Sequence, residues 1–140
     1  MARVNRNIKI VTIERDENMY KEAIRNIKIF NLQGHIKVIW DEALNVELKD
    51  KFDMIFIDCA KAQYIKIFEK FKVNLKDDGA IITDNINFHG LIADYDNIKS
   101  KSLKALLQKI KDYISFLEEN KEFKTTFYDM GDGISISKRG

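Results

Sequence analysis

The sequence predicts an α/β three-layer sandwich, in which helices cover a mostly parallel sheet that ends in an antiparallel hairpin. Two observations favour this fold class. Apolar runs of strand length alternate with segments of helical periodicity, as in parallel sheets with crossover helices. The last two runs, 123–130 and 134–138, are separated only by a Gly-Asp-Gly turn, which predicts a hairpin. We expect one domain over residues 1–140, because two independent cores would need a longer chain.

The composition is that of an ordinary globular protein. The formal net charge is +2 over 140 residues, so charge alone does not argue for a polyanionic partner. Cys59 is the single cysteine, which excludes an intrachain disulfide and a multi-cysteine zinc site and suits a reducing cytosol. Neither a signal-peptide pattern nor an apolar run of membrane-spanning length occurs, and we therefore expect a cytoplasmic protein without a membrane segment.

In the first third of the chain, one helix is predicted between two strands. Asp16 is a typical helix N-cap, and apolar residues recur after it at helical spacing. Gly34 is expected to stop this helix. The predicted elements are a strand at 8–13, a helix from Asp16 to Phe30, a strand at 36–40 and a short helical turn to about Leu48.

In the remainder, strands and helices continue to alternate up to the hairpin. Residues 52–58 are nearly all apolar, which is typical of a strand that is buried on both faces. Residues 99–119 carry apolar side chains at helical spacing and predict a long amphipathic helix. The other expected elements are a helix at 62–75, a turn at 77–79, a strand at 80–83 and an irregular loop at 86–97.

Acidic residues mark the ends of two of these strands. Asp58 ends one apolar run, and Asp84 with Asn85 ends another. In open α/β sheets ligands bind beyond the carboxyl ends of the strands, and hard divalent cations such as Mg²⁺ prefer oxygen ligands. These three residues therefore predict a metal site. The alternative is that both aspartates only cap the segments that follow them.

Two further acidic steps follow the first two strands. An acid at the position of Glu14 commonly accepts hydrogen bonds from the ribose hydroxyls of a nucleoside. The step Glu42-Ala43 could contact an adenine. Alternatively, Glu14 is a surface acid near a helix N-terminus, and the acidic step at 41–42 is a helix N-cap.

Lys61 follows Asp58 by three residues, at the start of a loop. A lysine there could act as a general base if its pKa were lowered, although a solvated surface lysine is the ordinary alternative. His35 and His89 have no partners at ligand or triad spacing, and we expect structural roles for both. Cys59 follows a buried strand and is expected to be inert.

Four blocks, taken in order, resemble a known enzyme family. They are VTIERDENMYKEA at 11–23, FDMIFIDCAKAQY at 52–64, ITDNINFHGLIAD at 82–94 and TTFYDMGDGISIS at 125–137. Together they resemble the cation-dependent O-methyltransferases, which include catechol and caffeoyl-CoA O-methyltransferases and small bacterial relatives, some of which methylate 5-hydroxyuridine in tRNA. The resemblance implies a Rossmann-like fold and a homodimer. It also implies a substrate with two vicinal oxygens, either a small hydroxylated molecule or tRNA.

The resemblance also assigns roles to individual residues. It implies contacts to S-adenosylmethionine from Glu14, Glu42 and Ala43, coordination of Mg²⁺ or another divalent cation by Asp58, Asp84 and Asn85, and catalytic roles at the substrate hydroxyl for Lys61 and Asp58. Glu42 stands where the family usually has an aspartate, so its contact with the adenine is expected to be longer or displaced.

In the family, a helical region, a first strand and a glycine-rich loop precede these blocks. Only seven residues precede the strand at 8–13 here, so we expect a truncated fold without that strand and loop. Three functions stay open: a metal-dependent O-methyltransferase, an inactive remnant of the fold that serves as an interaction module, and a receiver-like domain that is phosphorylated on Asp58.

Overall fold

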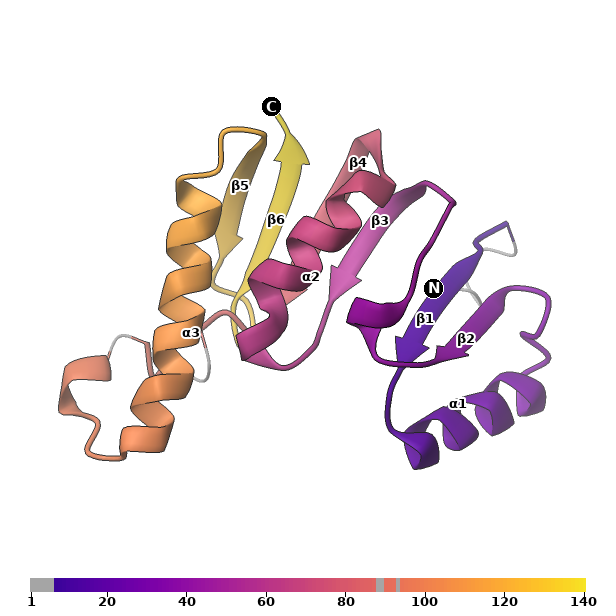
Figure 1. The fold of residues 1–140 in the computed structure, drawn as a ribbon, viewed down its shortest axis with the longest axis horizontal. Helices are drawn as coiled ribbons and strands as arrows, with labels where there is room; N and C mark the ends of the chain where they lie inside the picture. The colour runs from indigo at the N-terminus through magenta and orange to yellow at the C-terminus, as the bar shows by residue number, and fades with distance from the viewer. Residues whose placement is uncertain (1–6, 88–89, 93) are drawn as a thin grey trace. The chain divides into compact units, whose positions relative to one another are not determined.

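The computed structural model describes residues 7–87, 90–92 and 94–140. The structural role expected for His89 therefore lies outside the described residues, as does part of the loop expected at 86–97. The chain divides into two compact units, residues 1–47 and residues 48–140, which are coloured from indigo to yellow in Figure 1. The single-domain organisation stays a prediction.

Unit 1 contains a pair of parallel strands and one helix. Strands β1 (Ile10–Glu14) and β2 (Ile36–Trp40) pair in parallel, and α1 (Glu17–Ile29) connects them. The Asp16 carboxylate accepts hydrogen bonds from the backbone N–H groups of the next turn, so the predicted N-cap is confirmed. A 3₁₀ turn at Ala43–Asn45 follows β2, where the sequence predicts a short helical turn.

α1 ends where predicted, at Phe30, but Gly34 is not the residue that stops it. The helix stops at Ile29 with Phe30 as its C-cap, well before Gly34. Asn31 adopts a φ of 54°, and asparagine is one of the few residues that tolerate this left-handed conformation. Gly34 as the helix stop is therefore wrong, because Asn31 already turns the chain.

Unit 2 contains a four-stranded sheet in the order β3-β4-β6-β5. Its strands are β3 (Phe52–Ile57), β4 (Leu75–Asp84), β5 (Phe123–Tyr128) and β6 (Ile134–Arg139). The pair β3–β4 is parallel, whereas β4–β6 and β5–β6 are antiparallel, which confirms the predicted hairpin. Together with β1–β2, the described strands form two parallel and two antiparallel pairs.

Strand β4 is longer than predicted. Its register with β3 jumps from Phe52↔Leu75 to Met54↔Ala80, so the segment expected as a turn at 77–79 is an irregularity within the strand. Asp77, Asp78 and Gly79 are residue types that are typical of turns, but β4 pairs with β3 again from Ala80 onwards. These residues therefore lie within an irregular part of the strand and do not form a separate turn.

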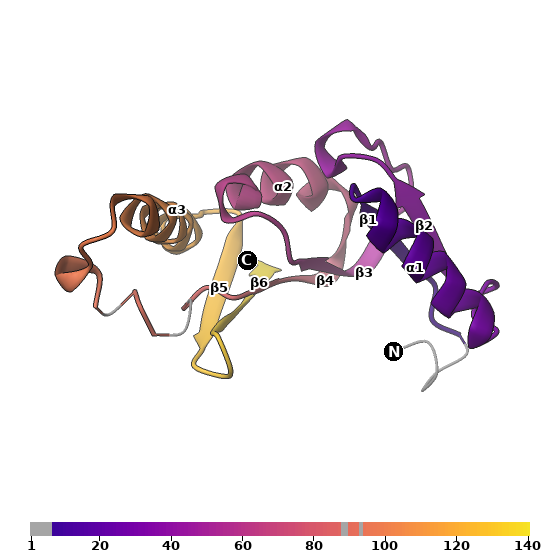
Figure 2. The same cartoon turned by 90° about the horizontal axis from the view of Figure 1, so that it is seen from below.

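Two helices lie on one face of this sheet, as Figure 2 shows. They are α2 (Tyr64–Phe71), with 3₁₀ turns at Lys61–Gln63 and Lys72–Asn74 on either side, and α3 (Lys101–Glu118), which follows a 3₁₀ turn at Tyr95–Asn97. The Ser100 hydroxyl caps α3 by accepting from the Leu103 N–H at 3.4 Å. The helices predicted at 62–75 and 99–119 are thus confirmed, with shorter α-helical cores.

The core of unit 2 is aromatic. The Phe68 ring contacts Tyr113, Phe116 and Phe123, with ring centroids 6.4, 5.4 and 5.2 Å apart. Phe68 and Tyr113 are fully buried. Such edge-to-face packing holds α2 and α3 against the hairpin.

Burial of β3 on both faces, as predicted from its apolar run, is wrong. Ile57 is 2% exposed, but Phe56 is 53% exposed and Met54 is 36% exposed. Successive side chains of a strand point to opposite faces, and within the described part of unit 2 the α-helices lie on one face only. The side chains that point to the other face therefore stay accessible.

In the described part of the chain, β1, β2 and β3 each pair with one strand only. β1 and β2 pair with each other, and β3 pairs with β4.

Candidate active site

The carboxyl ends of β3 and β4 bring two acidic residues together. Ile57 pairs with Thr83 in the parallel register, so Asp58 and Asp84, the next residues, are cross-strand neighbours. Adjacent strands lie about 4.8 Å apart. The strand register therefore places Asp58 and Asp84 at adjacent positions of the same sheet edge.

Asn85 follows β4 directly and has an unusual backbone conformation. Its φ is 59°, in the left-handed region that only a few residue types tolerate. The Asn85 N–H donates to Asp84 Oδ1 at 2.8 Å. The turn keeps Asn85 at the strand end beside Asp84, and conformations of this kind are concentrated at functional sites.

The donor set of this strand end fits a hard divalent cation. Within the described ranges, no group of three His, Cys, Asp or Glu side chains could hold a metal ion. The predicted set instead combines the carboxylates of Asp58 and Asp84 with the amide of Asn85. Mg²⁺ commonly binds through few protein oxygens and keeps its other positions for water or substrate, so two carboxylates and one amide suit it.

Lys61 lies in the 3₁₀ turn between β3 and α2 and is half-buried. Its ammonium donates a hydrogen bond to the Tyr64 hydroxyl. Burial lowers the pKa of Lys61, although the negative charges of Asp58, Asp84 and Asp132 act to raise it. A lowered pKa increases the fraction of neutral amine near neutral pH, and this is what a lysine general base requires.

Tyr64 connects Lys61 to the end of β4. Its side chain is fully buried, and its hydroxyl donates to the backbone oxygen of Asp84 at 2.8 Å. Burial raises the pKa of Tyr64, so its hydroxyl keeps its proton. The helix predicted at 62–75 contains Tyr64, but the sequence did not indicate these contacts, although the spacing of three residues from Lys61 could have indicated one of them.

The turn between β5 and β6 also reaches this site. The N–H groups of Ile86 and Asn87 donate to the carbonyls of Gly133 and Asp132 at 3.2 and 2.7 Å. Gly133 has a φ of +81°, and a Cβ atom there would lie 2.7 Å from the Asn87 Cβ. The turn is thus held against the segment after Asn85. Asp132 was not predicted as a site residue, because no local pattern in the sequence links a hairpin turn to a distant strand end.

The predicted cofactor residues lie in unit 1. Glu14 closes β1, and its Oε1 accepts from the Asp16 N–H at 2.8 Å. Glu42 follows β2, and its Oε2 lies 3.3 Å from Arg15 Nη1. Both acids are half-buried. Glu14 is the last residue of β1 and Glu42 follows β2 by two residues, so both lie at the carboxyl ends of paired strands, where nucleosides bind in such sheets.

The alternative that the acidic step at 41–42 caps the following turn accounts for part of these contacts. Asp41 Oδ1 accepts from the Glu42 N–H at 2.7 Å, whereas Glu42 makes no side-chain hydrogen bond to the turn that starts at Ala43. Asp41 is therefore the residue that supports the turn. The predicted site residues thus form one group in unit 1, with Glu14, Glu42 and Ala43, and one in unit 2, with Asp58, Lys61, Asp84 and Asn85.

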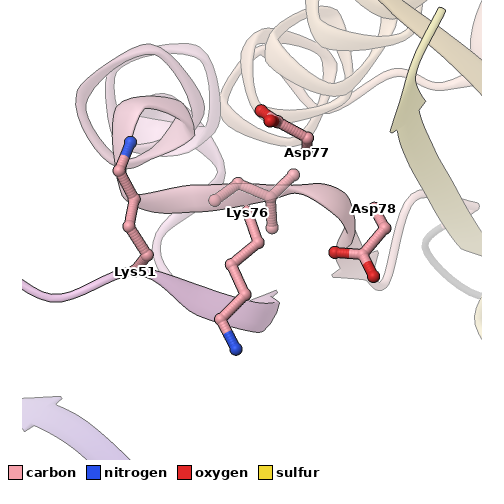
Figure 3. Close-up of a pocket in the computed structure, with 5 residues that line it drawn as sticks. Lys51, Lys76, Asp77 and Asp78 are labelled. Atoms are coloured by element: carbon pink, nitrogen blue, oxygen red, sulfur yellow. The ribbon is translucent and has the colours of Figure 1, made fainter.

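A surface depression in unit 2 lies away from these residues (Figure 3). It is lined by Lys51, Leu75, Lys76, Asp77 and Asp78, at the opposite end of β4 from Asp84. Lys76 forms an ion pair with Asp53 at 2.8 Å, and the Lys51 ammonium donates to the Val73 carbonyl. Because both lysines already have partners, the depression is not a good candidate for ligand binding.

Comparisons with known proteins identify relatives of the chain. A family model described as O-methyltransferase matches residues 2–140. Caffeoyl-CoA O-methyltransferase of Populus kitakamiensis is 24% identical over 139 residues, which cover 94% of this chain and 59% of that protein. Tapetum-specific methyltransferase 1 of Arabidopsis thaliana is 23% identical, with the same 94% and 59% covered. The chain thus spans less than two thirds of the length of these relatives.

Solved structures confirm the Rossmann-like fold class. A caffeoyl-CoA O-methyltransferase-like protein of Staphylococcus aureus is 35% identical with a TM-score of 0.92, and the match covers 99% of this chain and 68% of that one. An O-methyltransferase of Bacillus cereus in complex with SAH is 24% identical with a TM-score of 0.79, covering 94% and 63%. Since the family model matches nearly every residue, this chain belongs to the O-methyltransferase family.

Proposed function

We propose that this chain forms part of an O-methyltransferase that uses S-adenosylmethionine and a divalent cation to methylate a substrate with two vicinal oxygens. The observation that carries the proposal is the position of Lys61. It is half-buried, its pKa is lowered by burial, and it is influenced by the charges of both strand-end aspartates. Membership of the O-methyltransferase family and the solved relative in complex with SAH support the same activity.

Asp58, Asp84 and Asn85 would hold the cation, and Mg²⁺ is the ion that best suits their oxygens. When bound there, the cation would supply positive charge that favours deprotonation of a substrate hydroxyl. The two carboxylates belong to residues at adjacent strand ends, so the protein would fill only part of the coordination shell and the substrate oxygens could supply further ligands.

Lys61 is proposed to accept the proton of the substrate hydroxyl. Desolvation favours its neutral form, and the hydrogen bond to Tyr64 limits its movement. Glu14 is proposed to bind the ribose hydroxyls of S-adenosylmethionine, with Glu42 and Ala43 beside the adenine. One Glu14 oxygen accepts from the Asp16 N–H, which fixes the carboxylate while the other oxygen can still accept.

The substrate is proposed to be a small hydroxylated molecule or the 5-hydroxyuridine of a tRNA, since both offer vicinal oxygens. The homodimer and the cytoplasmic location also stay predictions. No helix in the described part of the chain is long and apolar enough to cross a membrane. The receiver-like alternative is wrong, because the chain belongs to the O-methyltransferase family.

Calorimetric titration tests the metal site first. Mg²⁺ is expected to bind the wild-type chain, and Asp84→Ala is expected to weaken this binding at least about tenfold through loss of one carboxylate ligand. Asp78→Ala is the matched control, because Asp78 is an exposed acid in the same strand at the opposite end. Equal Mg²⁺ affinity in wild type and Asp84→Ala would contradict the proposed ligands.

Methyl transfer tests the activity itself. The chain is incubated with labelled S-adenosylmethionine, Mg²⁺ and either catechol or tRNA containing 5-hydroxyuridine, and the methylated product is identified by mass spectrometry. Product with one acceptor establishes the activity and the substrate class. A folded chain that neither binds S-adenosylmethionine nor forms product would instead support the interaction module without catalysis.

A further inference from the structure

The Tyr64 hydroxyl connects two elements of the proposed active site. It accepts a hydrogen bond from the Lys61 ammonium and donates one to the Asp84 backbone oxygen at 2.8 Å. The first contact spans three residues, whereas the second links α2 to the end of β4, twenty residues further along the chain. Both contacts involve residues of the proposed site, one as the base and one as a metal ligand.

Packing leaves the Tyr64 ring little freedom. The side chain is fully buried, and its ring centroid lies 4.9 Å from that of Tyr113. A buried aromatic ring that is fixed by its neighbours has few alternative rotamers. Its hydroxyl is therefore a fixed point, in contrast to the long and flexible side chain of Lys61.

We infer that Tyr64 is a positioning residue that holds the Lys61 amine at the end of β4, beside Asp84. This inference rests on the proposed function, because the benefit of a fixed amine is realised when it takes a proton from a bound substrate. A misplacement of about 1 Å in a catalytic group can cost roughly a hundredfold in rate. Fixing Lys61 through a rigid buried hydroxyl avoids that loss.

The alternative is that Tyr64 is an ordinary core residue, whose hydroxyl forms these hydrogen bonds without any effect on the position of Lys61 during catalysis. Tyr113 provides a matched control for this alternative within the same core. It is also fully buried, and its hydroxyl lies 2.6 Å from Thr83 Oγ1. It thus makes one buried hydrogen bond next to the same strand end, with a threonine instead of Lys61.

The first experiment compares Tyr64→Phe with Tyr113→Phe in the 140-residue chain. Both variants keep the aromatic ring and lose one hydroxyl. Tyr64→Phe is expected to lower kcat about 10- to 100-fold while the KM for the acceptor and the Kd for Mg²⁺ change less than about threefold. Tyr113→Phe is expected to lower kcat less than about threefold. Equal losses in the two variants would overturn the inference.

A double-mutant cycle separates positioning from general damage. If the Tyr64 hydroxyl acts through Lys61, then removing it from the Lys61→Met variant causes no further loss of kcat. If it acts only through stability, the two losses multiply. Circular dichroism and thermal unfolding confirm that each variant is folded before its kinetics are compared.

A spectroscopic measurement tests the contact without any activity. In protein labelled with ¹⁵N-lysine, the Nζ–H signal of Lys61 is expected to be observable because its hydrogen bond slows proton exchange. It should persist in Tyr113→Phe and broaden beyond detection in Tyr64→Phe. If wild type transfers no methyl group but shows this pattern, the proposed function fails and the positioning of Lys61 stands. An unchanged Lys61 signal in Tyr64→Phe would overturn the inference by itself.

Discussion

The two units differ sharply in how much they bury. In unit 2, Tyr64, Phe68, Ile110 and Tyr113 have no exposed surface. Among the described residues of unit 1, only Val46 is buried, and no residue of α1 is buried.

This contrast indicates where rigidity is available. Two strands with a single helix bury too little apolar surface to be stable alone, whereas a four-stranded sheet under two helices has a real core. The proposed base and metal ligands lie on the packed unit, which suits groups that must be held in fixed geometry. The proposed cofactor residues Glu14 and Glu42 lie on the thin unit. We therefore expect the proposed cofactor contacts to be held less rigidly than the proposed metal site.

Hydrogen exchange should show the largest difference between the units. Amide protons of β4 and α3 are expected to exchange on the order of a thousandfold more slowly than those of β1 and α1, because their exchange requires unfolding of the core. Exchange measured by mass spectrometry over peptides of each unit tests this. Equal protection would show that the apolar surface of unit 1 is covered in solution.

Truncation of one phenylalanine in each unit sharpens the comparison. Phe68→Ala is expected to lower the free energy of unfolding by about 3–5 kcal/mol, because it leaves a cavity among three aromatic rings. Phe30→Ala in unit 1 is expected to cost about 1 kcal/mol or less, since Phe30 is 51% exposed. Denaturant unfolding monitored by circular dichroism measures both. Similar costs would contradict the difference in burial.

Two glycines of one turn test how unit 2 holds its site. Gly133→Ala is expected to cost about 2–4 kcal/mol, because its Cβ would lie 2.7 Å from the Asn87 Cβ at a φ of +81°. Gly131→Ala is the control: it also has a positive φ, but nothing lies within 4 Å of its Cβ, so only about 1–2 kcal/mol of backbone strain is expected. Thermal unfolding distinguishes the two, and equal losses would show that the turn is not packed closely against Asn87.

A surface network of unit 2 should give the smallest effect. Glu122 lies 2.9 Å from the Lys72 ammonium and also pairs with Arg139. The hydrogen bond from Lys72 lowers the pKa of Glu122. A carboxyl whose pKa is lower in the folded state stabilises the fold above its unfolded pKa, and this contribution is lost as the pH falls through the folded pKa.

Glu122→Gln is therefore expected to lower the free energy of unfolding by about 1 kcal/mol or less at neutral pH, because the pair is partly screened by solvent. The difference from wild type should disappear in acid. Glu22→Gln, on the exposed side of α1, is the control in unit 1 and is expected to change stability by less than about 0.5 kcal/mol at either pH. A Glu122→Gln effect that persists in acid would contradict the assigned pKa shift.

Local patterns predicted many elements well. The strand at Ile36–Trp40 has the expected bounds, the Asp16 cap is confirmed, and the hairpin forms around its glycine-containing turn. These features depend on interactions between residues that are close in sequence. The spacing of apolar residues and the presence of capping residues indicate such interactions directly. The prediction that Gly34 stops α1 was wrong, because Asn31, which also tolerates a positive φ, comes earlier in the chain.

Features that depend on distant contacts were predicted less well. The exposure of Phe56 follows from the absence of helices on that face within the described part of unit 2, and an apolar run cannot indicate which faces are covered. The continuous strand β4 follows from its pairing with β3, which overrides the turn residues within it.

For the candidate site, the sequence by itself determined that Asp58 and Asp84 stand at the carboxyl ends of two strands, because each terminates an apolar run of strand length. That these two strands are neighbours was decided by the sheet. The tertiary structure decided that the Tyr64 hydroxyl lies between Lys61 and the Asp84 carbonyl. It also decided that the turn with Asp132 packs against Asn87. Contacts between residues twenty or more positions apart arise from the packing of the helices and the hairpin on the sheet. The local spacing of apolar residues does not determine how these distant elements pack.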